Sequence, residues 1–368
     1  MSWAIWITGM PGSGKSALAR AAAATLRADD VPVRVLELDE IRQTLTPHPT
    51  YSDGERDVVY RALAAMATLL TEVGVPVIID ATSPRRQWRA LARSAIPRFA
   101  EIQLICPLEV CRERERTRPQ GYAPRGIYAH AGEPGATVPG VDVPYEVALQ
   151  PELVIDTSKE SVADGAARIV ALTNSLGSER QDRTEPRADG WAMWITGRPG
   201  SGKTTLTGHL VETLAARDIT VKVLDLATMR RFLLDDHTVS PGQQEIVYRA
   251  LVHIAKLLTQ VGVAVIVDAT APRRSWRDAA RAHIHRFAEV QLLCPSEICV
   301  ERERASRWGL SAEWHHAVER GAVSGPDIEM DYEESFNPDL VIHTHLHDPW
   351  STVELVMFLV HRLRQWPA

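Results

Sequence analysis

Two stretches of the chain combine closely spaced glycines with a lysine and a hydroxyl-bearing residue. Residues 9–16 read GMPGSGKS and residues 197–204 read GRPGSGKT, so both fit the pattern G-x-x-x-x-G-K-[ST]. The glycines let successive backbone N–H groups curl around phosphate oxygens, and the lysine reaches the terminal phosphates. Both stretches follow an apolar run and precede a helix-forming one, which is the context that this pattern requires. We therefore predict two phosphate-binding loops of the kind that hold a nucleoside triphosphate.

The residues predicted to bind nucleotide belong to these two loops. They are Gly9, Pro11, Gly12, Ser13, Gly14, Lys15 and Ser16 in the first, and Gly197, Gly200, Ser201, Gly202, Lys203 and Thr204 in the second.

Each loop has a carboxylate partner later in the chain. The apolar run VPVIID ends at Asp80, and VAVIVD ends at Asp268. An aspartate at the carboxyl end of a buried parallel strand faces the phosphate loop, where it can hold Mg²⁺ together with the loop hydroxyl. A helix N-cap is the alternative role for both aspartates. We predict ATP and Mg²⁺ as cofactors, with Ser16, Asp80, Thr204 and Asp268 as metal ligands.

The chain is an internal duplication. Lys203 lies 188 residues after Lys15, and the same offset separates Asp268 from Asp80 and Cys299 from Cys111. The segment PELVIDT at 151–157 recurs as PDLVIHT at 338–344. A polar, charged stretch without apolar periodicity separates the copies. We predict a first domain in residues 1–176, a linker in 177–190 and a second domain in 191–368.

Strand and helix patterns alternate within each copy. In copy one, strands are expected at 3–8, 31–38, 75–79, 101–106 and 153–155, and helices at 16–28, 52–73, 84–95, 108–118 and 161–176. Ser52 and Glu55 have the S-x-x-E spacing of a capping box at the start of the second helix. Such alternation predicts the α/β class, with two tandem P-loop domains that are each built on a doubly wound parallel sheet.

The composition of the chain limits the partners that can be expected for it. The 368 residues carry a net charge of -6, so nucleic acid is not an expected partner. No stretch approaches the ~20 apolar residues of a membrane span, and the first residues run directly into a strand pattern, so we predict a cytoplasmic protein. The four cysteines lack metal-site spacing and are expected to be buried thiols, while His315 and His316 are adjacent and lack a third ligand.

Four segments of copy one resemble the adenylylsulfate (APS) kinases. The family pattern L-D-G-D-N-[VI]-R corresponds to LELDEIR at 36–42, and F-S-x-x-[DE]-R-x-x-N-[IV]-R to YSDGERDVVYR at 51–61. The I-S-P-x-R turn corresponds to TSPR at 82–85, and G-[IV]-D-x-P-Y-E to GVDVPYE at 140–146. The resemblance spans almost all of copy one and implies transfer of the γ-phosphoryl group of ATP to a hydroxyl group of APS.

The resemblance also implies roles for individual residues. Asp39 would act as base or orient the acceptor hydroxyl, so the expected catalytic residues are Asp39, Lys15 and Asp80. Arg114 would lie near the ATP. The substrate would be held by Arg42, Arg56, Ser83 and Arg85. Because the family works as dimers, the two copies are expected to pack as a pseudo-dimer, and further homo-oligomers are allowed.

The sequence departs from the family at the acceptor. Ala81 and Val138 stand where the family stacks the substrate adenine between aromatic rings, an interaction worth about 1–3 kcal/mol per base. Another small alcohol, such as a sugar, nucleoside or natural-product intermediate, therefore stays open as the acceptor. A nucleotide-binding switch or ATPase without an acceptor is the alternative from a different class.

Copy two departs further. Ala227 stands where copy one has Asp39, and Asp225, two residues earlier, is a doubtful replacement. We expect copy one to be active and copy two to bind nucleotide with little or no phosphoryl transfer.

Overall fold

The computed structural model describes residues 2–118, 121–122, 126–129, 131–177, 190–234, 239–307 and 330–365. Contacts divide the chain into two compact units, Met1–Arg183 and Thr184–Ala368, and each is described here by itself. Residues 178–189 of the predicted linker, and His315 and His316, lie outside the described residues. The pairing of the two copies therefore stays a prediction. None of the described helices combines the length and apolarity needed to span a bilayer.

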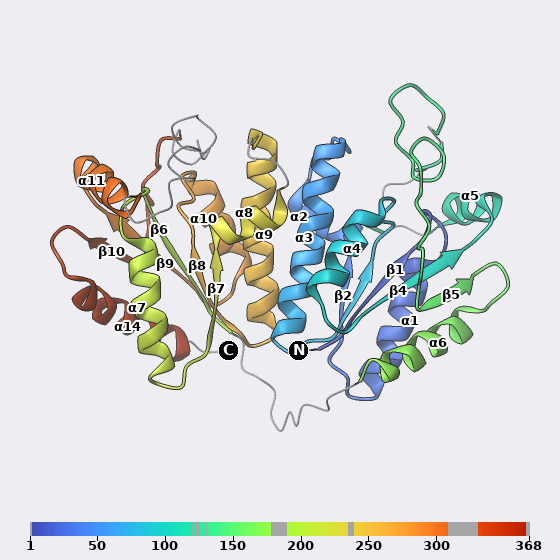
Figure 1. Cartoon of the computed structure of the whole chain (residues 1–368), viewed down its shortest axis with the longest axis horizontal. Helices are drawn as coiled ribbons and strands as arrows, with labels where there is room; N and C mark the ends of the chain where they lie inside the picture. The colour runs from blue at the N-terminus through green and yellow to red at the C-terminus, as the bar shows by residue number, and fades with distance from the viewer. Residues whose placement is uncertain are drawn as a thin grey trace. The chain divides into compact units, whose positions relative to one another are not determined.

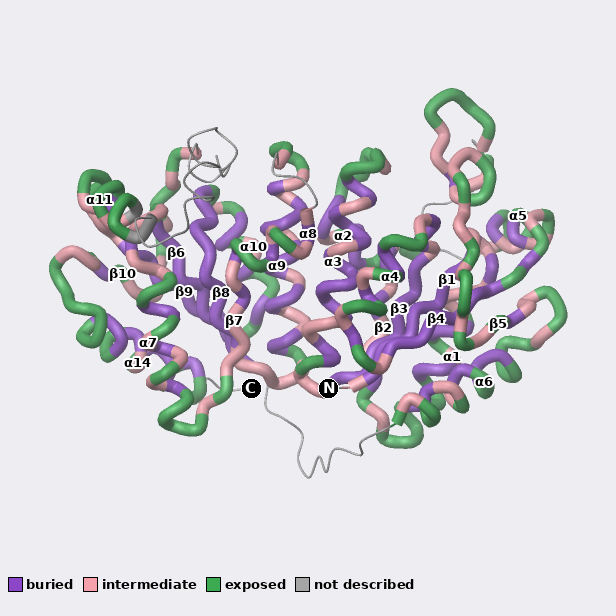
Figure 2. Tube along the Cα trace, in the orientation of Figure 1, coloured by how far each residue is buried: buried purple, intermediate pink, exposed green. Residues whose placement is uncertain are grey.

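Copy one is built on a five-stranded parallel sheet. The central strand β1 (Ala4–Thr8) lies between β3 (Val77–Asp80) and β4 (Phe99–Ile105), with β2 (Arg34–Glu37) beyond β3 and β5 (Leu153–Asp156) beyond β4. Strands β1 and β3 are buried along their whole length (Figure 2). This burial explains why both strands are continuous apolar runs instead of alternating ones.

Helices cover both faces of this sheet (Figure 1). Helices α1 (Lys15–Ala28) and α6 (Val162–Ser175) pack together, and their apolar residues join strand residues such as Ile5, Ile7 and Ile102 in one core. Helices α3 (Asp53–Glu72) and α4 (Arg86–Ala95) pack against each other beside β3 and β4, and α5 (Leu108–Thr117) follows β4. The carboxyl ends of β1, β2 and β3 consequently open onto a common edge, which is where such sheets bind ligands.

Copy two repeats this plan in the described residues. Its sheet has the order β10-β9-β6-β8-β7, formed by β6 (Ala192–Gly197), β7 (Val221–Asp225), β8 (Ala264–Asp268), β9 (Phe287–Leu293) and β10 (Leu340–His343). Its helices are α7 (Lys203–Ala215), α8 (Leu226–Leu233), α9 (Pro241–Gln260), α10 (Arg274–His283), α11 (Ser296–Arg307) and α14 (Pro349–Gln365). The predicted fold class, two tandem doubly wound parallel sheets, is confirmed.

One helix of copy one was not predicted. The strand expected at 31–38 ends at Glu37, and Leu38 begins helix α2 (Leu38–Leu45). Leu38, Ile41 and Leu45 form its buried face at helical spacing. Asp39 therefore lies in the first turn of a helix, two residues beyond the end of the strand.

Candidate functional site

The first glycine-rich loop joins β1 to α1. Gly14 has a φ of 95°, and the helix begins at the next residue, so the free N–H groups of its first turn face the cavity. Gly12 has a φ of 75°, and a Cβ atom there would come within 2.3 Å of the backbone oxygen of Cys111. Glycine is required at position 12 both by backbone conformation and by the close approach of α5.

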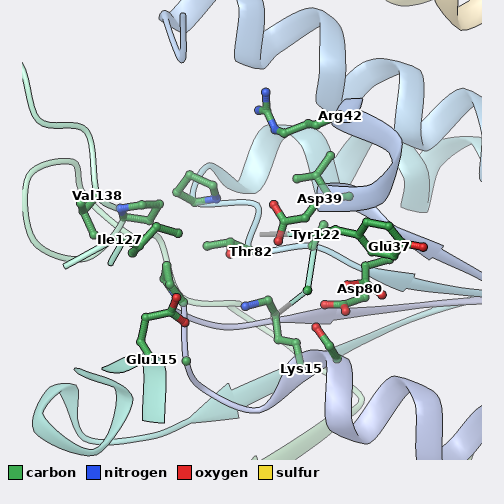
Figure 3. Close-up of a pocket in the computed structure, with 18 of the residues that line it drawn as sticks. Lys15, Glu37, Asp39, Arg42, Asp80, Thr82, Glu115, Tyr122, Ile127 and Val138 are labelled. Carbon is green, nitrogen blue, oxygen red and sulfur yellow. The ribbon is translucent and has the colours of Figure 1, made fainter. Parts of the chain in front are cut away.

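Lys15 is half-buried and lines the cavity at the start of α1. Its Nζ donates a hydrogen bond to the backbone oxygen of Met10, at 3.0 Å. Burial lowers the pKa of Lys15, while the charges of Asp80 and Asp39 act in the opposite direction. Figure 3 shows the Lys15 amino group and the carboxylates of Asp39 and Asp80 facing the same space. A cation in this position can meet the terminal phosphates of a nucleotide.

Asp80 ends β3 and is only 4% exposed. Burial raises its pKa to about 6, against the opposing effects of the Lys15 charge and a hydrogen bond with Ser16. Its Oδ2 atom is buried and has no hydrogen-bond partner among the described residues. A buried carboxylate oxygen beside a hydroxyl group is the hard oxygen donor set that Mg²⁺ prefers, so Ser16 and Asp80 fit that ion.

Asp39 projects from the first turn of α2 into the same cavity. Burial raises its pKa, and the charges of Lys15 and Arg42 lower it. The neighbouring carboxylate of Glu37 is already engaged by Arg20, through bonds of 3.1 and 2.8 Å. A carboxylate whose pKa is raised toward neutrality is a stronger proton acceptor, which suits Asp39 to the role of base.

The cavity has a volume of about 830 Å³. It is bounded by the glycine-rich loop, α2, the turn after β3, α5 and the lid segment, which is defined here as residues 126–129 and 131–146. Arg42, Arg56 and Arg114 all line it. Arg56 donates through Nη2 to both the backbone oxygen and the hydroxyl of Thr137, each at 2.7 Å, and thereby joins α3 to the lid segment.

Arg114 is held in place by Thr157, which follows β5. Its guanidinium donates to the Thr157 backbone oxygen at 2.7 Å and to the Thr157 hydroxyl at 3.1 Å. The same hydroxyl donates to the backbone oxygen of Ser13 at 2.9 Å. Thr157 thus links Arg114 to the phosphate loop, a role that the sequence interpretation missed although its segment recurs in both copies.

Two of the expected substrate residues lie outside the cavity lining. Ser83 is fully buried with a φ of 44°, and its N–H donates to the Tyr60 hydroxyl at 3.1 Å. Arg85 forms an ion pair with Asp53 at 2.7 Å. Their turn instead contributes Ala81, Thr82 and Pro84 to the cavity.

Two loop residues also lie outside the lining. These are Gly9, where a Cβ atom would meet the Ser13 Oγ at 2.6 Å, and Ser13, which is buried beneath the loop. The absence of a side chain at Gly9 lets the loop close on itself, and nucleotide binding by Gly9 and Ser13 stays a prediction. The sequence interpretation also missed residues that do line the cavity, among them Glu37, Tyr51, Thr82 and Tyr122.

The glycine-rich loop of copy two has contacts similar to those of copy one. Lys203 donates to the backbone oxygens of Gly197 and Arg198, each at 3.0 Å. Burial raises the pKa of Asp268, and hydrogen bonding to Thr204 opposes that rise. Gly200, like Gly12, would place a Cβ atom 2.3 Å from a backbone oxygen, here of Cys299.

Arg302, the counterpart of Arg114 in copy two, is held as in copy one. Arg302 donates to the Thr344 backbone oxygen and hydroxyl at 3.0 and 3.2 Å. The Thr344 hydroxyl donates to the Ser201 backbone oxygen at 2.9 Å. This chain of bonds matches the one formed by Arg114, Thr157 and Ser13.

The acceptor side of copy two differs. Asp225, the candidate substitute for the missing base, accepts hydrogen bonds from the backbone N–H groups of Ala227 and Thr228, at 3.4 and 2.8 Å. It is therefore the N-cap of α8. A carboxylate used in this way does not replace Asp39.

Comparison with known proteins gives the same family for both copies. The family model described as adenylylsulphate kinase matches residues 1–156 and 189–343. A probable adenylyl-sulfate kinase of Archaeoglobus fulgidus is 39% identical over 162 residues, which are 43% of this chain and 98% of that protein. A probable bifunctional SAT/APS kinase of Sorangium cellulosum is 37% identical over 175 residues, and the match spans only 29% of its length.

A solved structure is also similar. The Mycobacterium tuberculosis APS kinase in complex with AMPPNP and APS is 30% identical, with a TM-score of 0.42. The similarity covers 47% of this chain and 98% of that one.

Proposed function

The chain belongs to the adenylylsulphate kinase family, and we propose that its first copy phosphorylates a hydroxyl group of APS with Mg·ATP. Family membership makes it an ATP-dependent kinase. The choice of APS rests on the named relatives, which are adenylyl-sulfate kinases. The single observation that carries the proposal is the meeting of Lys15, Asp39 and Asp80 with Arg42 and Arg56 in one cavity.

The proposed reaction is an in-line displacement. The acceptor oxygen forms a bond to the γ-phosphorus, and the bond from that phosphorus to the β–γ bridging oxygen breaks, so ADP leaves with the electron pair. The hydroxyl proton passes to the carboxylate of Asp39. Lys15 and the N–H groups of the loop stabilise charge on the phosphate oxygens. When bound, Mg²⁺ would neutralise further phosphate charge, and Ser16 and Asp80 would hold it.

Arg42 and Arg56 supply the positive charge expected for an anionic acceptor. Both line the cavity on the side of α2 and α3. A guanidinium group binds phosphate or sulfate through two parallel hydrogen bonds, which fixes orientation as well as position. Arg114, held by Thr157, is proposed to serve the nucleotide.

ADP release with Mg·ATP, in the presence and absence of APS, tests this proposal. APS should stimulate the wild-type chain strongly, and Asp39→Asn should lower the stimulated rate at least ~100-fold because it removes the proton acceptor. Glu40→Gln is the matched control, since Glu40 is exposed in the same helical turn and its change removes the same charge. An APS-stimulated rate in Asp39→Asn equal to that of the control would contradict the assignment of the base.

For copy two we propose nucleotide binding without transfer. The specific observation is that Lys203, Asp268 and the Arg302–Thr344 contacts repeat those of copy one, whereas Ala227 replaces the base. Titration of the full chain with AMPPNP should give two sites per chain. Lys15→Ala should leave one site, and the double variant Lys15→Ala, Lys203→Ala should leave none. Complete loss of binding in the single variant would show that copy two holds no nucleotide.

A further inference from the structure

Glu55 forms a buried hub at the start of α3. It is only 8% exposed and occupies the third position of the helix, where the spacing from Ser52 predicts a capping box. Only half of that box forms. The Ser52 hydroxyl accepts a hydrogen bond from the Glu55 N–H, but the Ser52 N–H donates to the Thr50 hydroxyl, at 3.4 Å. The Glu55 carboxylate is thereby available for other partners.

Those partners are three residues from outside the helix. Oε2 accepts from the N–H and the hydroxyl of Thr50, at 2.6 and 2.7 Å. Oε1 accepts from the N–H of Tyr51 at 3.3 Å and from Nη1 of Arg42 at 3.1 Å. Hydrogen bonds to an ionised carboxylate are short and strong, so one side chain joins α2, the loop before α3 and α3 itself.

Each partner of Glu55 lines the cavity, whereas Glu55 does not. Thr50, Tyr51 and Arg42 belong to its wall, at the end where Arg56 also lies. The label of Arg42 in Figure 3 marks this end, on the far side of Asp39 from Lys15. A residue that bonds to these three lining residues but does not itself line the cavity acts on a ligand only through them.

The conformation of Tyr51 also depends on this hub. Its φ of 54° lies in the left-handed region, which a residue with a bulky side chain rarely adopts unless neighbouring contacts impose it. The bond from its N–H to Glu55 is such a contact. In this conformation the Tyr51 ring lies against the guanidinium groups of Arg42 and Arg56, at 5.2 and 6.0 Å from its centroid.

Copy two provides an internal comparison. At the corresponding position Gln243 forms the complete capping box, in which its Oε1 accepts from the Ser240 N–H at 3.0 Å. Val239 and Gln244 replace Tyr51 and Arg56. In the copy that lacks a counterpart of Asp39 and of the second arginine, the residue at this position thus completes the capping box of its own helix.

We infer that Glu55 is a positioning residue that sets acceptor affinity by fixing Arg42 and Tyr51. The inference rests on the proposed function, because the acceptor end is the end of the cavity opposite the phosphate loop. It assigns no chemical step to Glu55.

The test compares Michaelis constants of the full chain for APS and for ATP. Glu55→Gln keeps the shape but removes the charge and one acceptor oxygen, so the KM for APS should rise at least ~10-fold, while the KM for ATP stays within about twofold. Thr50→Val removes a single hydroxyl donor and should shift the KM for APS in the same direction by a smaller factor. Gln243→Glu in copy two is the matched control, with both constants unchanged.

The outcomes separate this inference from the proposed function. A wild-type chain in which APS does not stimulate ADP release overturns the proposed function and this inference with it. An active wild type whose KM for APS is unchanged in Glu55→Gln and Thr50→Val overturns the inference alone. An equal rise of both Michaelis constants, together with a lower melting temperature, shows a merely structural residue and also overturns it. If Glu55→Gln fails to fold, the milder Thr50→Val decides.

Discussion

A single buried carboxylate, Asp80, couples stability to the metal chemistry of the site. In the metal-free protein its pKa rises from near 3.8 to about 6, so the folded chain binds a proton more tightly than the unfolded chain across that interval. The free energy of unfolding must fall as the pH rises through this window. Above about pH 6, the ionised carboxylate lowers stability by at most about 3 kcal/mol.

We predict that Asp80→Asn is more stable than the wild type at about pH 8 and similar to it at about pH 4, because the variant carries no ionisable group there. The same variant should lose phosphoryl transfer. Urea unfolding with a chelator present, at both pH values, measures the difference. A stability difference that does not change with pH would refute the coupling.

Thr157 offers a second prediction at the scale of the residue. Its hydroxyl joins Arg114 to the backbone oxygen of Ser13. Thr157→Val keeps the shape and removes both of these hydrogen bonds, so the KM for ATP should rise at least roughly 5–10-fold, as expected when each lost hydrogen bond contributes about 1–1.5 kcal/mol. Thr157→Ser retains the hydroxyl and should stay near wild type. A rise in the KM for APS instead of ATP would mean that Arg114 serves the acceptor and would contradict its assignment to the nucleotide.

At the scale of the element, the phosphate loop and α5 are packed backbone to backbone. Gly12→Ala would bring a Cβ atom to 2.3 Å from the Cys111 backbone oxygen at a positive φ. We expect a loss of stability of about 1–3 kcal/mol and at least ~10-fold weaker AMPPNP binding, since the loop must shift. Urea unfolding and titration calorimetry measure the two effects.

Gly132→Ala is the control for this prediction. Gly132 also has a positive φ, of 86°, but nothing lies within 4 Å of the added atom. It isolates the conformational part of the cost from the steric part. If both variants lose equal stability, the close approach of α5 is not what restricts position 12.

Most of the elements, and the meeting of the glycine-rich loop with Asp80 at one cavity, could be predicted from the sequence. The glycine-rich loop and the strand that ends at Asp80 are contiguous patterns whose local geometry follows from residue type and spacing. Helix α2 was missed because its first residue, Leu38, continues the pattern of the predicted strand 31–38. Its one buried face, at Leu38, Ile41 and Leu45, was the available signal.

The acceptor half was less predictable, because its contacts join distant segments. The capping-box spacing of Ser52 and Glu55 is a local pattern, and it cannot indicate that the carboxylate turns away to Arg42 and Thr50. Likewise the turn containing Ser83 and Arg85 was expected to hold the substrate. Its backbone places Ala81, Thr82 and Pro84 at the cavity instead, and only the tertiary fold decides between neighbouring residues of a turn.

At the scale of the whole molecule, the charge of the cavity opposes that of the chain. Arg42, Arg56 and Lys15 line a cavity in a protein whose net charge is -6. Charges within a cavity of low dielectric attract an anion locally, and the surrounding surface repels it. We predict that kcat/KM for APS falls several-fold when the ionic strength rises from about 0.02 to about 0.3 M, because salt screens the attraction.

Initial-rate assays at a series of ionic strengths measure this dependence. In Arg56→Gln, kcat/KM for APS should depend less steeply on ionic strength. A rate that rises with salt would mean that repulsion by the acidic surface dominates approach to the cavity. The cytoplasmic location and the pairing of the two copies stay predictions from the sequence.

Each glycine-rich loop packs against a helix that lies later in its copy, α5 in copy one and α11 in copy two. This packing influences which residues a duplicated domain keeps during evolution. A Cβ atom at Gly12 or at Gly200 would come equally close to a cysteine backbone oxygen, although Ala227 replaces Asp39 at the other side of copy two. Substitution at either glycine is opposed by folding alone, so natural selection for a stable domain preserves it even in a copy released from catalysis. Retained glycines are therefore no record of retained binding.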